Sequence, residues 1–193
     1  MGQKKERIIL AAQDVFLANG IEKTKVSDIV KTAGVAQGTF YLYFPTKYSI
    51  MPEIAKLLLQ DVLTYLKEHT DNNASYETQL MQTVEAILTF NAQHKDRQKL
   101  LYAGLAQGEY IGQWEEIYEP FYRQMTHLIE KGLEQGQFKT TLNPSNAARI
   151  VIGTMESTAE QLYLFNEQVS DAFVQEQTVA LKQFIKNALG IYE

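Results

Sequence analysis

The chain contains no cysteine, only four prolines and a single tryptophan. Without cysteine it forms no disulfide and has no thiolate chemistry, which fits a reducing compartment. Long apolar runs are missing as well. The run at residues 8–12 ends at Gln13 and Asp14, too early for the core of a signal peptide or for a membrane span. We therefore expect a cytoplasmic protein with no membrane partner.

Patterns typical of catalytic and metal sites are also missing from the sequence. The three histidines, His69, His94 and His127, are isolated, and no Glu-x-x-His pair supplies ligands for a di-iron site. No P-loop, dinucleotide-binding fingerprint or nucleophile elbow occurs. We expect no metal, no cofactor and no enzymatic activity.

Negative charge prevails, but it is unevenly distributed. The formal net charge is −5. Residues 1–47 hold seven Lys or Arg and four acidic residues, a net charge of +3, whereas the remainder holds 11 and 19, a net charge of −8. A basic segment on an acidic body permits contact with DNA at one end of the protein only.

Helix-forming residues dominate the periodic stretches of the chain. With 11 glycines, few prolines and 45% apolar residues, the periodic stretches predict an all-α protein with a real core. We expect helices over about 4–18, 25–33, 36–43, 47–69, 76–93, 96–107, 114–131, 144–165 and 170–189. Pro52 should kink or delay the first regular turn of the fourth helix, and it is a candidate for localised bending there.

Two short helices around residues 33–35 form the most informative segment. Thr24 is expected to cap the first of them, and Gly34 suits the left-handed position after it. Phe40 and Phe44 are expected in the core, while Gln, Thr and Tyr side chains face outward. A plain helical corner would show the same periodicity. Gly38 favours DNA binding, because it lowers helix propensity but allows the backbone to approach a groove closely.

The motif Gly20-x3-Thr24-x-Val26-x-Asp28-Ile29-x3-Ala33-Gly34-Val35-x-x-Gly38-Thr39-Phe40-Tyr41-x-Tyr43-Phe44-x-x-Lys47 resembles the N-terminal signature of the TetR/AcrR family of transcriptional regulators. Leu128-Ile129-x-x-Gly132-x3-Gly136-x-Phe138 is similar, more weakly, to a later segment of that family. One departure is Ala36, where many members have Ser or Thr.

The resemblance implies an N-terminal three-helix helix-turn-helix DNA-binding domain at residues 1–47 and a C-terminal helical ligand-binding and dimerisation domain at residues 48–193. It implies base or adjacent phosphate contacts from the helix that reads the major groove, and backbone contacts from its flanks. The expected DNA-binding residues are Thr24, Lys25, Ser27, Gln37, Gly38, Thr39, Tyr41, Tyr43 and Lys47.

The helix at residues 144–165 has two apolar stripes where one core needs a single stripe. A four-helix interface with a second copy of the chain would bury both stripes. A central helix buried within a single chain is the alternative. The expected dimer interface consists of Ile152, Met155, Ala159, Tyr163, Leu181 and Phe184.

Aromatic and acidic residues gather near the middle of the chain. They would suit a pocket for a lipophilic or cationic molecule, because aromatic faces and a carboxylate offset positive charge. Otherwise the aromatics are core and the glutamates a solvated face. The expected pocket residues are Tyr102, Glu109, Trp114, Tyr118 and Tyr122.

Together these expectations describe a ligand-responsive regulator, a repressor that binds a palindromic double-stranded DNA operator as a homodimer and is released by a small-molecule inducer. Two alternatives remain open at this point. One is a dimeric helical adaptor without a DNA role, and the other is a small all-α enzyme, for which the sequence offers no convergent titratable groups.

Overall fold

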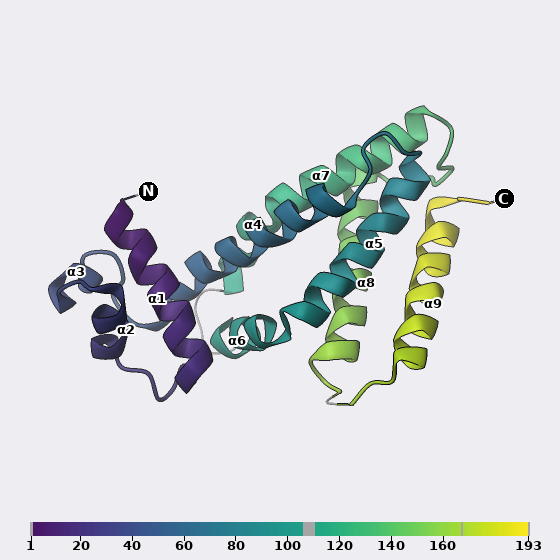
Figure 1. Ribbon diagram of the computed structural model, residues 1–193. Helices are drawn as coiled ribbons and strands as arrows, with labels where there is room; N and C mark the ends of the chain where they lie inside the picture. Colours follow the sequence, from purple (N-terminus) through teal and green to yellow (C-terminus); the bar gives the residue numbers. More distant parts are fainter. Residues whose placement is uncertain (1, 106–110, 167, 193) are drawn as a thin grey trace. The chain divides into compact units, whose positions relative to one another are not determined.

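The computed structural model describes residues 2–105, 111–166 and 168–192, and within these ranges it is helical without any strand (Figure 1). The α-helices are α1 (Gln3–Asn19), α2 (Val26–Ala33), α3 (Gln37–Tyr41), α4 (Met51–His69), α5 (Tyr76–Gln93), α6 (Lys95–Leu105), α7 (Trp114–Glu134), α8 (Pro144–Tyr163) and α9 (Asp171–Leu189). Short 3-10 helices lie at Tyr48–Ile50 and Ile111–Gln113. The predicted all-α class is confirmed.

The chain forms two compact units that cut across the order of its helices. The first contains residues 1–60 and 96–117, and the second contains residues 61–95 and 118–193. Helices α4 and α7 each contribute residues to both units. In the parts of the chain that the structure describes, no helix is long and apolar enough to span a bilayer.

The core of the first unit forms where α1 and α2 pack together. From α1, Ile8, Ala12 and Phe16 are buried, and Ile29 and Ala33 of α2 pack against that face. Phe40 of α3 and Phe44 after it are buried too, with ring centroids 5.6 Å apart, as the sequence predicted. Burying large aromatic and aliphatic side chains in this way holds three short helices together that would be marginal alone.

The start of α4 follows from Pro52. A 3-10 turn at Tyr48–Ile50 comes first, and α4 begins at Met51, so Pro52 is its second residue and needs no intrahelical N–H. The predicted delay of the first regular turn is confirmed. Pro120 lies inside α7, where the sequence analysis had not considered its effect on the helix.

In the second unit, side chains cap three helices. The Ser75 hydroxyl accepts a hydrogen bond from the Thr78 N–H at the start of α5, and the Ser170 hydroxyl accepts one from Phe173 at the start of α9. Asn143 caps α8, which begins at Pro144. At the end of α7, Gly136 adopts a φ of 68°, a left-handed conformation that suits glycine.

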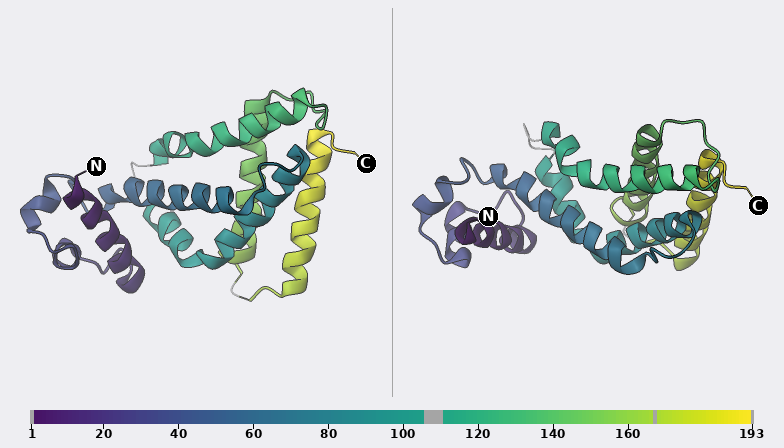
Figure 2. Two further views of the ribbon diagram at one scale, coloured as in Figure 1. Left: turned by 45° about the horizontal axis from the view of Figure 1, so that its top comes forward. Right: turned by 90° about the horizontal axis from the view of Figure 1, so that it is seen from above.

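Helix α8 packs against both α5 and α9, and α5 also contacts α9 (Figure 2). Its buried residues come from both predicted stripes and are Ala147, Ala148, Val151, Ile152, Met155, Ala159 and Leu162. Neighbouring helices of the same chain therefore bury the two stripes of α8. This was the alternative to burial by a second copy.

Candidate functional site

The turn between α2 and α3 fixes the angle at which α3 is presented. Gly34 has φ 63° and ψ 42°, and the Val35 N–H donates to the Val30 carbonyl over 3.0 Å. The Arg7 guanidinium on α1 donates to the carbonyls of Ala33 and Gly34. The positive φ favours glycine at residue 34, whereas a Cβ there would meet only the movable end of the Arg7 side chain.

Helix α3 buries one face and exposes the other. Phe40 faces the core, whereas Gln37 and Gly38 are exposed and Thr39 is half-buried. Apart from its chain neighbours and the backbone of α3, no atom of the described residues lies within 4 Å of the position that a Cβ on Gly38 would occupy, so internal packing does not explain this glycine. The structure thus brings the predicted base-contacting residues onto a single outward surface.

Three consecutive residues at the end of α3 also face solvent. Tyr41, Leu42 and Tyr43 are 50%, 81% and 40% exposed. The two tyrosines were predicted to contact DNA, whereas Leu42 was not. The sequence could have pointed to Leu42, because it lies between two outward tyrosines and Phe40 already occupies the inner face of the helix.

The N-terminus of α2 lies at residues 25–28. Lys25 and Ser27 are exposed, and the Lys25 N–H donates to the Asp28 carboxylate over 2.9 Å. Asp28 therefore satisfies one of the free amides at this helix end. Ala36, which precedes α3, provides no side-chain cap.

The expectations for Thr24 need correction. It is only 2% exposed, it precedes Lys25 at the N-cap position, and its hydroxyl donates to the Gly20 carbonyl over 2.8 Å. Thr24 does not cap α2, because its hydroxyl instead closes the turn that follows α1. Buried there, the side chain is not available to a phosphate.

The geometry of Lys47 also differs from the prediction. Its Nζ atom donates to the carbonyls of Ile21, Glu22 and Thr24 at 2.7, 2.9 and 3.1 Å. An ammonium group has three N–H donors, so these bonds use all of them. Lys47 fastens residues 21–24 to the start of α4 and has no donor left for a DNA phosphate.

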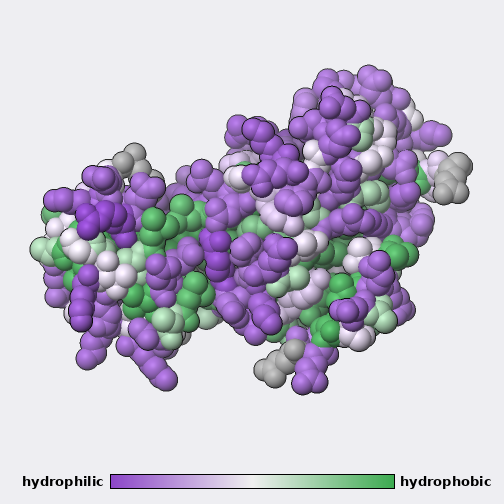
Figure 3. Space-filling view, viewed as in Figure 1, coloured by the Kyte–Doolittle hydropathy of each residue, from purple (hydrophilic) through white to green (hydrophobic). Residues whose placement is uncertain are grey.

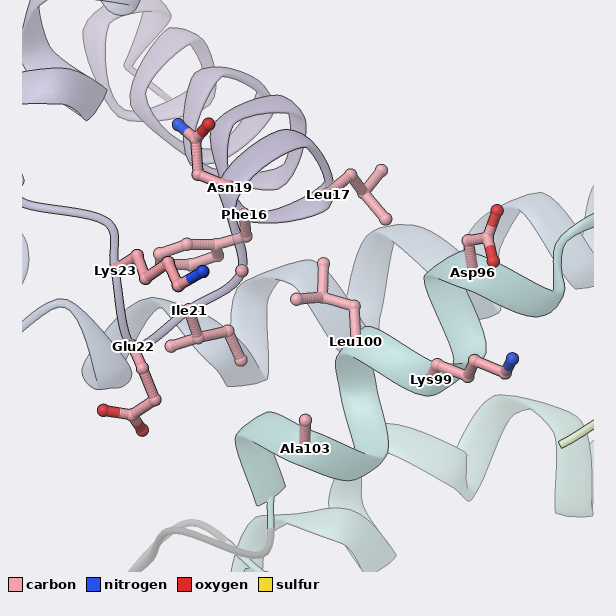
Figure 4. A pocket seen from close by; sticks show the side chains of 11 residues that line it. Phe16, Leu17, Asn19, Ile21, Glu22, Lys23, Asp96, Lys99, Leu100 and Ala103 are labelled. Carbon is pink, nitrogen blue, oxygen red and sulfur yellow. The ribbon is translucent and has the colours of Figure 1, made fainter. Parts of the chain in front are cut away.

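A cavity of about 690 Å³ opens in the first unit between the end of α1, the following loop and α6 (Figure 4). Its apolar lining includes Phe16, Ile21 and Leu100. The charged side chains around it have both signs and are Glu22, Lys23, Asp96 and Lys99. This balance favours neither anionic nor cationic molecules.

The predicted pocket residues do not all fall in the same unit. Tyr102 and Trp114 belong to the first unit, and Tyr118 and Tyr122 belong to the second. Glu109 lies outside the described residues. No group of three or more acidic, His or Cys side chains with metal-site geometry occurs in the ranges that the structure describes.

Tyr118 and Tyr122 of α7 are part of a cluster with α8. Their ring centroids are 5.8 Å apart, the Arg149 guanidinium lies 4.3 Å from the Tyr122 centroid, and the Tyr118 hydroxyl is hydrogen-bonded to the Glu156 carboxyl. This set, Tyr118, Tyr122, Arg149 and Glu156, is called the Glu156 cluster below. It pairs aromatic faces with a carboxyl and a guanidinium.

Protein atoms surround the Glu156 carboxyl, although the residue keeps some accessible surface. Loss of hydration raises the pKa of Glu156 from 4.5 to about 7, and repulsion from Glu160 acts in the same direction. The hydrogen bond from Tyr118 opposes them. Sequence reasoning missed this residue, although it follows Ile152 by four positions and so lies on an apolar stripe.

The interface prediction for α8 and α9 also needs correction. Ile152, Met155 and Ala159 are buried inside the protomer, because α5, α8 and α9 pack against one another, whereas Leu181 also lines the outer groove described below. Side chains in that core are not available to a second copy. Tyr163 is half-buried, and Phe184 is 56% exposed.

A groove of about 390 Å³ lies on the outer side of α8 and α9. Its lining includes Thr154, Ser157, Gln177, Leu181 and Phe184. Figure 3 shows hydrophobic groups at the surface over α9, where Phe173, Val179 and Phe184 are exposed. An exposed apolar face of this kind commonly marks an interaction surface.

Family comparison adds independent findings. Residues 8–54 match the family described as bacterial regulatory proteins, tetR family, and residues 80–189 match tetracyclin repressor-like, C-terminal domain. The chain is 35% identical to the uncharacterized HTH-type transcriptional regulator YvdT of Bacillus subtilis (strain 168), covering 97% of this chain and 95% of that protein. It is 27% identical to the fatty acid metabolism regulator protein of the same strain, covering 89% and 90%.

Among solved structures, the chain superposes on Thermus thermophilus FadR, a TetR family transcriptional repressor in complex with lauroyl-CoA, with a TM-score of 0.75. The match covers 98% of this chain and 96% of that chain at 18% identity. At this identity the likeness establishes the fold.

Proposed function

Because this chain belongs to the tetR family of bacterial regulatory proteins and is a DNA-binding transcriptional regulator, we propose that it represses transcription from a palindromic operator and that a small molecule releases it. The outward surface of α3 is the observation that supports operator reading. We assign DNA binding to residues 1–47 and ligand binding and dimerisation to residues 48–193. The protein acts in the cytoplasm and has no catalytic activity.

In this proposal α3 enters the major groove, where base edges can be distinguished. Gln37, Thr39 and Tyr41 contact base edges or adjacent phosphates, and Gly38 allows close approach. Lys25, Ser27 and Tyr43 contact the backbone, which positions the helix without specifying sequence. Thr24 and Lys47 support the turn beneath the interface.

A homodimer would place two α3 helices in successive major grooves, about 34–36 Å apart on DNA. We propose that the α8–α9 groove forms the interface, with Phe184 at its centre. A symmetric contact uses the same patch on both copies, which suits one self-complementary groove. This interface leaves out Ile152, Met155 and Ala159, which are buried within the protomer, and keeps Leu181 and Phe184.

For the effector, we propose binding beside the Glu156 cluster. An ionised carboxyl near aromatic faces attracts cations, and apolar surroundings suit lipophilic molecules. The solved structure of Thermus thermophilus FadR contains lauroyl-CoA, which makes a partly lipophilic effector a reasonable class for this fold. The effector lowers DNA affinity only by its differential affinity for two conformations, typically about 1–3 kcal/mol.

The test is selection from a random duplex pool, followed by gel-shift titration with the DNA upstream of the protein's own gene. We expect one enriched palindrome and an affinity that falls steeply with salt. Tyr41→Ala should relax sequence preference, whereas Lys25→Ala should weaken binding to all sequences alike. Enrichment of no sequence would refute the repressor and favour a helical adaptor.

A further inference from the structure

Another cavity, which lies in the second unit, has a different chemistry from the sites above. It has a volume of about 420 Å³ and lies among the end of α4, the start of α5 and the second half of α7. This volume is within the range of small-molecule sites. The cavity shares no lining residue with the Glu156 cluster, and all of its lining residues belong to the second unit.

The formal charge in the lining of this cavity is positive. It comes from Lys67, His127 lines the cavity as well, and no Asp or Glu does. The second unit as a whole is acidic, with 14 Asp or Glu against eight Lys or Arg. Neither Lys67 nor His127 forms an ion pair with any residue in the described ranges. The ammonium group of Lys67 therefore stands at this cavity without an internal counterion.

An unpartnered hydroxyl supports the same assignment. The Thr70 Oγ1 atom is inaccessible to solvent and has no hydrogen-bond partner among the described residues, and Thr70 lines the cavity. A buried hydroxyl without a partner is unfavourable, and such groups call for an explanation such as a bound molecule. The neighbouring Thr83 hydroxyl, by contrast, donates to the Gln79 carbonyl over 2.8 Å.

The remaining walls suit an apolar body. Leu63, Leu66 and Leu128 line the cavity together with Tyr76. A carboxylate accepts hydrogen bonds and donates none, so it matches an ammonium group, an imidazole N–H and a free hydroxyl at the same time.

We propose that this cavity binds a small organic carboxylate, with the acid group held by Lys67, His127 and Thr70 and the apolar part against the leucines. A cation would find like charge at this cavity, and a neutral apolar molecule would leave the Thr70 hydroxyl unpaired. The site does not depend on how the protein contacts DNA.

The test is calorimetric titration of the full-length protein with benzoate, benzyl alcohol and benzylamine, which differ in the charge of the head group. We expect benzoate to bind most tightly and benzylamine most weakly. Lys67→Gln should weaken benzoate binding about tenfold, as expected for loss of one charge-assisted hydrogen bond. Lys139→Gln, an exposed lysine of the same unit that does not line the cavity, is the matched control and should change nothing.

Thr70→Val supplies a second, opposite readout. It should weaken benzoate binding but raise the melting temperature of the free protein, because it removes the unpaired hydroxyl while keeping the side-chain shape. The proposal is overturned if benzoate fails to bind at millimolar concentration, if benzylamine binds at least as well, or if only water fills the site and Thr70→Val lowers the melting temperature. Operator gel shifts, measured separately, reveal whether the proposed repressor function fails independently.

Discussion

Lys47 gives the sharpest test of how the helix-turn-helix is supported. Lys47→Met keeps the apolar stem and removes the ammonium group from the carbonyls of Ile21, Glu22 and Thr24. Hydrogen bonds to charged groups contribute about 1.5–3 kcal/mol each. One of the three bonds is solvent-exposed, and water can replace it. The other two are only partly buried, so we count each at about 1–2 kcal/mol and expect a total loss of about 2–4 kcal/mol of unfolding free energy.

In a chain of this size, 1 kcal/mol shifts the melting temperature by about 2–4 °C. The expected decrease is thus about 5–15 °C, measured by circular dichroism. Amide hydrogen exchange should increase at residues 21–25, where the released loop lies. Lys25→Met is the matched control, because Lys25 is exposed and its stability effect should stay within about 0.5 kcal/mol.

The two variants should also differ in DNA binding. Lys25→Met should weaken operator affinity at unchanged stability. If Lys47→Met instead leaves the melting temperature within about 1 °C of the wild type and reduces affinity for all sequences as Lys25→Met does, then Lys47 binds a phosphate and its role as an internal fastener is refuted.

Three further variants test other parts of the structure. Glu156→Gln should raise the melting temperature at pH 8 but not at pH 4.5. The folded pKa of about 7 exceeds the ordinary 4.5, so the folded state loses stability as pH rises between these values, on the order of 3 kcal/mol. Glu176→Gln, exposed on α9, should show no such difference. Phe184→Glu should give a monomer by light scattering, because it places a charge in the proposed interface. Val179→Glu, which is exposed but outside the groove, should leave the dimer intact. An unchanged mass for Phe184→Glu would disprove the interface. Gly38→Ala should stabilise α3 by up to about 1 kcal/mol yet weaken operator binding at least tenfold, and unaltered affinity would exclude close approach at Gly38.

Local signals in the sequence were sufficient for the helices and the turn before α3. The left-handed turn at Gly34 and the inward spacing of Phe40 and Phe44 follow from local backbone geometry, so the sequence pattern predicts their positions. Lys47 and Thr24 are different, because their partners are set by how residues 20–24 fold against the start of α4. A motif that fixes residue types does not reveal whether a lysine faces DNA or a carbonyl.

Burial of α8 was predictable, but the group that covers each stripe was not. Periodicity shows that Ile152 and Val151 lie on apolar faces, and it does not distinguish α5 of the same chain from a second copy. Glu156 was missed because a glutamate in a helix is typical of a surface residue, and its burial depends on packing that the sequence does not show. Its raised pKa depends on packing around Tyr118.

The structure argues against bending at Pro52. Pro52 is buried in the first turn of α4, and contacts on both sides join that turn to the rest of the first unit. Before it, Tyr48 donates to the Glu22 carboxylate over 2.8 Å, and after it Glu53 pairs with Lys5 of α1 over 3.3 Å. Because the first turn of α4 is held on both sides, we expect it to move together with α1 and not to bend relative to it.

Pro52→Ala should therefore change neither operator affinity nor the response to the releasing molecule by more than about twofold, although losing the buried ring should lower the melting temperature slightly. Lys5→Met is the comparison, because it breaks the contact between α1 and α4 without altering the helix backbone. If Pro52→Ala keeps operator affinity but abolishes release, the signal passes through bending at Pro52, and the rigid start of α4 described above is not how the protein responds.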